Sequence, residues 1–193
     1  MKSAVLSMLF AITFPATGNA AGWTLDKVHS QVNFSVTHLV VAEVTGGFKD
    51  FDVTFESMKE DFSDATIGAT IRTSSIDTDN QKRDGHLKSD DFLNAETFPD
   101  IAFKSVSIEK TGEGRYKITG DLTIRDVTKS VVLDTWFRGT VKDPWGGTRA
   151  GFKATTVINR FDYGVRWDAA IEAGGLVAGE EVEITLLLEF IKQ

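Results

Sequence analysis

Apolar and polar side chains alternate along most of the chain after residue 22, and this period of two is typical of β-strands. In residues 31–38, for example, Val32, Phe34 and Val36 share one face and polar side chains share the other. Most links between these segments are short, and short links join antiparallel neighbours. The alternation predicts eight strands, within residues 31–38, 51–55, 67–71, 101–108, 116–124, 131–138, 152–158 and 181–190.

Two of the connections are long. The first, residues 73–100, falls between the third and fourth predicted strands and contains residues 80–88, which are predicted to form a short helix despite Gly85. Ser89 can cap a further turn through its side-chain oxygen. The second, residues 160–180, is rich in glycine and has no clear periodicity.

Eight antiparallel strands predict an all-β fold, and closing them into a barrel removes the exposed sheet edges. A barrel of eight strands is just wide enough either to fill with side chains or to hold one ligand. A two-sheet sandwich has the same periodicity and is the structural alternative.

The first twenty residues have a different pattern. Lys2 precedes a mostly apolar, uncharged run over residues 3–14, and small residues at positions 18 and 20 suit a cleavage site. The run is too short to span a membrane. We therefore predict a cleavable signal peptide over residues 1–20, a single domain over residues 22–193 without an integral membrane span, and export to a bacterial periplasm. A buried N-terminal helix is the alternative.

The charge and the residue types exclude several classes of function. With 21 basic and 28 acidic side chains the formal charge is −7, which argues against nucleic-acid binding and against electrostatic docking on anionic lipid. A lipid held inside the protein is not excluded by this charge. The chain has no cysteine, so it can form neither a disulfide nor a thiolate metal site.

Several short motifs follow one another along the chain: His29-Ser30, Arg83-Asp84-x-His86-Leu87, Gly120-Asp121-Leu122-Thr123 and Asn159-Arg160-Phe161-Asp162. In this order, and over nearly the whole chain beyond the signal peptide, they resemble the YceI-like family of polyisoprenoid-binding, lipocalin-like proteins. The resemblance implies an extended eight-stranded antiparallel barrel, a helix over one connection, a long isoprenoid or other amphipathic lipid inside, and secretion to the periplasm. Leu93 departs from the family pattern, in which a second Phe follows Phe92, so the family's chain-length and headgroup preferences do not transfer.

The inward face of the predicted strands provides a candidate ligand tunnel. A polyisoprenoid offers almost no hydrogen-bonding group except its head, so its affinity must come from burying apolar surface, at about 0.8 kcal/mol per CH₂. The alternative is that the same side chains simply fill the barrel, and a slip of one residue would exchange the two faces. The predicted tunnel lining is Val32, Phe34, Val36, Phe51, Val53, Phe55, Ile71, Phe103, Ile118, Leu122, Phe137, Phe152, Ile158, Leu186 and Leu188.

Three polar residues, Arg83, His86 and Arg160, are candidates for the mouth of this tunnel. In one interpretation they contact a polar or phosphate headgroup, because a guanidinium can bind phosphate with two hydrogen bonds. In the other, which we favour, they are structural. Arg83, Asp84 and His86 would then form ion pairs that hold the helix, with His86 paired to Asp90 four residues later, and Arg160 would hydrogen-bond across strand ends.

The sequence contains no P-loop, nucleophile elbow, dinucleotide-binding glycine motif or His-Glu-x-x-His motif. We therefore predict no catalytic residues, no metal site and no cofactor other than a bound lipid. The predicted function is a periplasmic protein that binds or carries an isoprenoid-type lipid, of the polyprenyl or quinone type, for transport, storage or protection.

Two other functions remain open from the sequence. One is a stress-response or interaction protein with a filled barrel, and the other is an enzyme that hydrolyses or isomerises a lipid with Arg83, Asp84 and His86. The expected partners are the lipid and a membrane protein that donates or accepts it. An exposed strand edge would also permit a homodimer.

Overall fold

The computed structural model describes residues 21–170 and 175–193. The predicted signal peptide, residues 1–20, lies outside the described residues. Within these two ranges no helix is long and apolar enough to cross a membrane. The strands are β1 (Ala21–Leu25), β2 (Gln31–His38), β3 (Ala42–Phe48), β4 (Phe51–Ser57), β5 (Thr66–Arg72), β6 (Ile76–Asp77), β7 (Asp100–Gly112), β8 (Arg115–Ile124), β9 (Val127–Lys142), β10 (Thr148–Asn159) and β11 (Ala178–Lys192).

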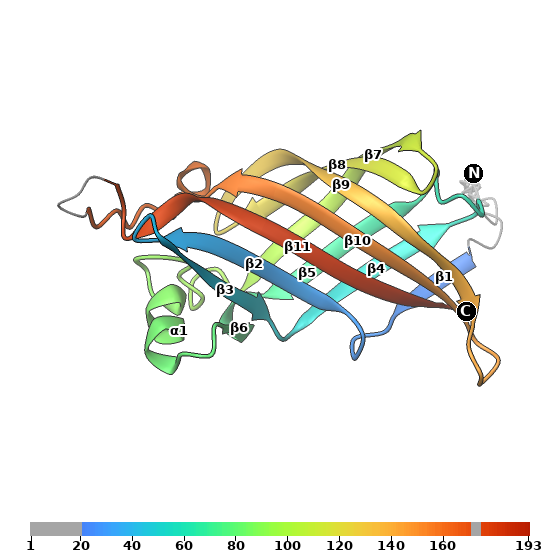
Figure 1. Ribbon diagram of the computed structural model, residues 1–193, viewed down its shortest axis with the longest axis horizontal. Helices are drawn as coiled ribbons and strands as arrows, with labels where there is room; N and C mark the ends of the chain where they lie inside the picture. The colour runs from blue at the N-terminus through green and yellow to red at the C-terminus, as the bar shows by residue number, and fades with distance from the viewer. Residues whose placement is uncertain (1–20, 171–174) are drawn as a thin grey trace, which may run out of the picture.

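All of these strands belong to one antiparallel sheet that closes on itself (Figure 1). Their order is β1-β4-β5-β7-β8-β9-β10-β11-β2-β3-β6, and β1 pairs with β11 as well as with β4. The segments β1 and β2 are consecutive and both pair with β11, so they form one bent strand of the barrel. On one side of it, β4 pairs with β1 and β3 pairs with β2, and beyond them β5 pairs with β4 and β6 pairs with β3, so β3 with β4 and β5 with β6 form two more bent strands. The result is a closed eight-stranded antiparallel barrel, as the alternation predicted, and the sandwich alternative is wrong.

The burial of the side chains follows the predicted alternation. In β4, Phe51, Val53 and Phe55 are buried and the residues between them are exposed. In β8, Tyr116 and Ile118 are buried and alternate in the same way with exposed or half-buried residues. The register in which these strands pair therefore directs the expected face inward.

Strands β1, β3 and β6 were not predicted. Strands β1 and β6 are only five and two residues long, and β3 contains Gly46 and Gly47, which interrupt the alternation. Gly46 is required by packing, because a Cβ at this position would lie 2.6 Å from the side chains of Phe34 and Thr78. The glycine therefore lets β3 approach β2 closely.

A short helix, α1 (Gln81–Lys88), follows β6 and precedes β7, and it lies at the end of the barrel opposite the C-terminus (Figure 1). The side chain of Asn80 accepts a hydrogen bond from the backbone N–H of Arg83, which caps the helix. The buried carboxylate of Asp84 accepts hydrogen bonds from the N–H and the hydroxyl of Thr78, at 2.9 and 2.6 Å. These bonds fasten α1 to the chain that leaves β6.

The other end of the barrel is covered by aromatic rings. Phe62, from the connection between β4 and β5, is 5% exposed. The centroid of its ring lies 5.1–5.5 Å from the ring centroids of four other aromatic residues, Trp23, Phe55, Phe137 and Phe152. Its φ of 56° turns the backbone so that the ring points into the barrel. The hydroxyl of Tyr116 donates to the preceding carbonyl, of Asp61, at 2.6 Å and holds this connection in place.

Candidate functional site

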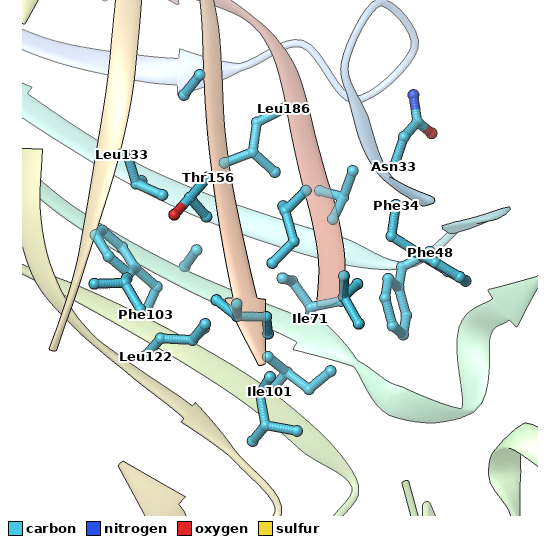
Figure 2. Close-up of a pocket in the computed structure, with 18 of the residues that line it drawn as sticks. Asn33, Phe34, Phe48, Ile71, Ile101, Phe103, Leu122, Leu133, Thr156 and Leu186 are labelled. Atoms are coloured by element: carbon cyan, nitrogen blue, oxygen red, sulfur yellow. The ribbon is translucent and has the colours of Figure 1, made fainter. Parts of the chain in front are cut away.

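The barrel contains an apolar cavity of about 380 Å³, which lies within the size range of small-molecule sites. Figure 2 shows Ile71, Ile101, Phe103, Leu122 and Leu186 around it. The rings of Phe55, Phe62, Phe152 and Phe190 form its floor, at the aromatic end of the barrel. The alternative of a completely filled barrel therefore does not describe this structure.

Thirteen of the fifteen predicted lining residues contact the cavity. Because they come from seven strands, the cavity is a property of the closed barrel rather than of any one segment. They are Val32, Phe34, Val36, Val53, Phe55, Ile71, Phe103, Ile118, Leu122, Phe152, Ile158, Leu186 and Leu188.

The remaining two, Phe51 and Phe137, point inward but do not line the cavity, and their prediction as lining residues was wrong. Phe51 packs in the buried cluster that includes Val32 and Val53. The ring of Phe137 lies 5.1 Å from that of Phe62, and Phe62 itself lines the cavity floor. Both side chains therefore contribute to packing behind the cavity wall.

Sequence reasoning also missed several lining residues. Ile101 and Ile184 share the phase of residues that were predicted, so the alternation could have identified them. Phe62 and Trp167 lie in connections outside the strands, where no periodicity indicates which side chains turn inward.

At the end near α1, which we call the mouth, the lining includes Arg83, His86 and Leu87 from the helix together with Trp167 and Val177. Arg83 donates from Nε to the hydroxyl of Thr78 and from Nη2 to the carbonyl of Thr78, both at 2.7 Å. Its position is therefore set by the same residue that holds Asp84. The predicted ion pairs of Arg83 and Asp84 are wrong, because both side chains satisfy their charged groups with hydrogen bonds to Thr78.

His86 interacts with Asp91, at 2.9 Å between Nε2 and Oδ2, and the predicted pair with Asp90 is wrong. The reason is that α1 ends at Lys88, so Asp90 does not lie one helical turn beyond His86. The imidazole also packs edge-on against the rings of Phe92 and Trp167, at 4.9 and 5.4 Å. An aromatic cluster therefore orients His86 at the mouth.

Arg160, in the short 3₁₀ helix Arg160–Tyr163 after β10, is the most deeply buried cation at the mouth, with 6% exposure. It donates to the carbonyls of Val165, Gly179 and Ala178, at 2.8, 2.8 and 2.9 Å. These bonds agree with the predicted structural role across strand ends. Loss of solvation lowers the pKa of the Arg160 guanidinium, although nearby acidic side chains oppose this effect.

A separate polar cluster lies near the β9–β10 hairpin. Asp26, His29 and Glu189 are close enough to share a cation, but Nη1 of Arg149 donates to both of the carboxylates. The guanidinium therefore already supplies positive charge to this cluster. Its Nε also donates to Asp143 at 2.7 Å, which ties the hairpin to the barrel.

Comparison with known proteins agrees with this architecture. The YceI-like domain matches residues 23–190. A UPF0312 protein of Ectopseudomonas mendocina is 41% identical over 176 residues, covering 90% of this chain and 89% of that protein. The crystal structure of a Campylobacter jejuni YCEI protein has a TM-score of 0.70 and 32% identity, covering 88% of this chain and 97% of that one.

A more distant structure shares the fold. A domain of Saccharophagus degradans, described as a polyisoprenoid binding domain implicated in plant cell wall breakdown, has a TM-score of 0.63 and 14% identity, covering 90% of this chain and 99% of that one. Together with the motifs in the sequence, the domain match and the Campylobacter relative confirm that the chain belongs to the YceI-like family.

Proposed function

We propose that this protein binds a long apolar lipid of the isoprenoid type, with the hydrocarbon chain in the barrel and the headgroup at the mouth. The observation that carries the proposal is the cavity, which has apolar walls, an aromatic floor and charged side chains at the α1 end. The polyisoprenoid-binding description of a protein with the same fold supports it.

The energetics favour this class of ligand. Each buried CH₂ equivalent contributes about 0.8 kcal/mol, so several isoprene units would gain more than about 10 kcal/mol before the costs of ordering and association. The ring edges and aliphatic side chains of the walls offer few hydrogen bonds. A ligand with a polar group in mid-chain would therefore lose hydrogen bonds to water without replacement.

The mouth suits an oxygen-rich headgroup. A guanidinium has five N–H donors, and Arg160 uses three of them in the bonds to backbone carbonyls. Arg83 uses two of its own on Thr78. Both side chains line the cavity, so we propose that their remaining donors bind phosphate or carbonyl oxygens of the headgroup in addition to the structural role of these arginines.

We further propose that the protein acts as a carrier or store in the periplasm, after removal of residues 1–20, rather than as a catalyst. An enclosed lipid is shielded from water, so transport, storage and protection all follow from the same geometry. A membrane protein that donates or accepts the lipid is the expected partner. Lipid turnover, with loss of turnover in His86→Ala, would support the enzymatic alternative instead.

The test is mass spectrometry of an organic extract of the protein purified from a bacterial host. We expect a stoichiometric isoprenoid-type lipid in the parent protein. Thr156 lines the cavity (Figure 2), so Thr156→Phe should place a ring in the path of the lipid chain and lower the lipid content at least about fivefold. The matched control is Val157→Phe, because Val157 is on the outer face of the same strand.

Three results would count against the proposal. An empty extract that stays empty after incubation with polyprenyl and quinone lipids would exclude isoprenoid binding. Unchanged lipid content in a folded Thr156→Phe variant would show that the lipid lies elsewhere. A stoichiometric phospholipid would keep a carrier function but exclude the isoprenoid preference.

A further inference from the structure

The turn between β2 and β3 exposes three consecutive apolar side chains. Leu39, Val40 and Val41, which we call the apolar tip, are 40%, 61% and 88% exposed. Val40 approaches Gly175, where a Cβ would lie 2.9 Å from its Cγ2, yet all three side chains stay largely exposed. Single exposed apolar residues are common on protein surfaces, but this contact does not account for an uninterrupted run of three at the end of a hairpin.

The backbone of the apolar tip does not favour these residue types either. Leu39 and Val40 have φ values of 50° and 64°, and the N–H of Val41 donates to the carbonyl of His38 at 3.3 Å. Two successive positive φ values define a turn that prefers Asn-Gly, and a β-branched residue is unfavourable there. The apolar side chains are thus present at a cost to the turn, which points to a role outside folding.

The apolar tip is part of the mouth of the cavity. Thr37 and His38, immediately before it, line the cavity, and so does Val177. The backbone nitrogen of Leu39 and Nδ1 of His38 both lie within hydrogen-bonding distance of the carbonyl oxygen of Val177, at 3.0 and 2.9 Å. In Figure 1 the β2–β3 turn and α1 lie at the same end of the barrel, opposite the β9–β10 hairpin.

We propose that the apolar tip inserts into the surface of a lipid bilayer and places the cavity mouth against it. This inference rests on the proposed function, because a water-insoluble ligand needs a route between the bilayer and the cavity that avoids water. The formal charge of −7 gives no general attraction to anionic lipid. Docking through the apolar tip should therefore depend on hydrophobic burial and be insensitive to salt.

A second copy of the chain is a poorer occupant for this surface. A stable protein interface uses roughly 20–30 residues from each partner, whereas the apolar tip has three. Insertion into a bilayer requires no complementary surface, and a few apolar side chains are enough for reversible binding.

The experiment is flotation of the purified full chain with phosphatidylcholine vesicles, at low and high salt. The key variant is the double substitution Leu39→Asn with Val40→Gly. It removes two of the three apolar side chains of the tip, leaving Val41, and supplies the residues that this turn prefers. We therefore expect unchanged or higher thermal stability together with about a tenfold or greater loss of vesicle binding.

The matched control is Trp145→Ser. Trp145 is 84% exposed in the β9–β10 hairpin, at the opposite end of the barrel, so its loss should leave vesicle binding unchanged. Lipid content, measured by mass spectrometry, separates this inference from the proposed function. We expect the tip variant to retain the lipid of the parent while transferring it to vesicles at least about tenfold more slowly.

Several outcomes would overturn the inference. The parent protein could fail to bind the vesicles, or the tip variant could bind them as well as the parent does. A loss of vesicle binding in Trp145→Ser as large as that in the tip variant would also overturn it. Binding that disappears at high salt would show electrostatic docking instead. A parent dimer that the tip substitutions convert to a monomer would identify a second copy as the occupant.

Discussion

Replacing Phe62 tests whether the aromatic floor stabilises the barrel and limits the cavity. Its ring is 5% exposed and touches four other aromatic rings at centroid distances of 5.1–5.5 Å. Removal of a buried Phe side chain typically costs about 3–5 kcal/mol, as transfer energy plus the penalty for the space left behind. This is a large part of the roughly 5–15 kcal/mol by which a domain of this kind is stable. We therefore expect Phe62→Ala to destabilise the protein by about 3–5 kcal/mol.

A second substitution at the same site separates the ring from the backbone. The φ of Phe62 is 56°, a conformation that costs a non-glycine residue about 1–2 kcal/mol. Glycine avoids this cost but loses about 0.4–1 kcal/mol through its more flexible unfolded state. Phe62→Gly should therefore be more stable than Phe62→Ala, by up to about 1.5 kcal/mol, although it removes the same ring.

The assay is equilibrium unfolding in urea, with the midpoint and the slope fitted for each variant. Met58→Ala is the control, because Met58 is in the same part of the chain but is exposed, and we expect a change below about 0.5 kcal/mol. A loss of less than about 1 kcal/mol in Phe62→Ala would refute the role given to the floor. Phe62→Gly less stable than Phe62→Ala would refute the backbone argument.

The remaining predictions concern glycine packing, the buried arginine and acid stability. Gly120→Ala should lower the free energy of unfolding in urea by about 1–3 kcal/mol, because its Cβ would lie 2.7 Å from a backbone carbonyl oxygen. Gly85→Ala has open space around it and should stabilise α1 by about 0.5–1 kcal/mol. Equal effects of the two substitutions would contradict the close packing at Gly120. Arg160→Met should cost about 2–3 kcal/mol and increase hydrogen exchange in residues 175–179, and unchanged exchange would exclude its fastening role. A hydrogen bond from His29 lowers the pKa of Asp26 from 3.8 to about 2, so this carboxylate stabilises the fold above about pH 4 and the contribution is lost as the pH falls towards 2. In acid titrations monitored by circular dichroism, Asp26→Asn should lose less stability than the parent between about pH 4 and pH 2. A titration identical to that of the parent would contradict the stabilising role given to the Asp26 carboxylate.

The sequence by itself determined which face of most strands points into the barrel. A strand directs successive side chains to opposite sides, so the alternation of Val32, Phe34 and Val36, or of Phe152 and Ile158, is a property of the residue order alone. The number of barrel strands followed from the alternation, and their antiparallel pairing followed from the short connections. Motifs such as Arg83-Asp84-x-His86-Leu87, taken in their order along the chain, were enough to indicate the family.

Only the tertiary structure decided where the cavity ends and what closes it. Phe62 and Trp167 enter the lining from irregular connections, and no local period specifies the direction of a side chain there. The partner of His86 depended on where α1 ends. The buried guanidinium of Arg160 donates hydrogen bonds to backbone carbonyls that are 5, 18 and 19 residues away in the sequence. Strand faces are local consequences of backbone geometry, whereas the floor and mouth arise from contacts between segments distant in sequence, which form only when the barrel closes.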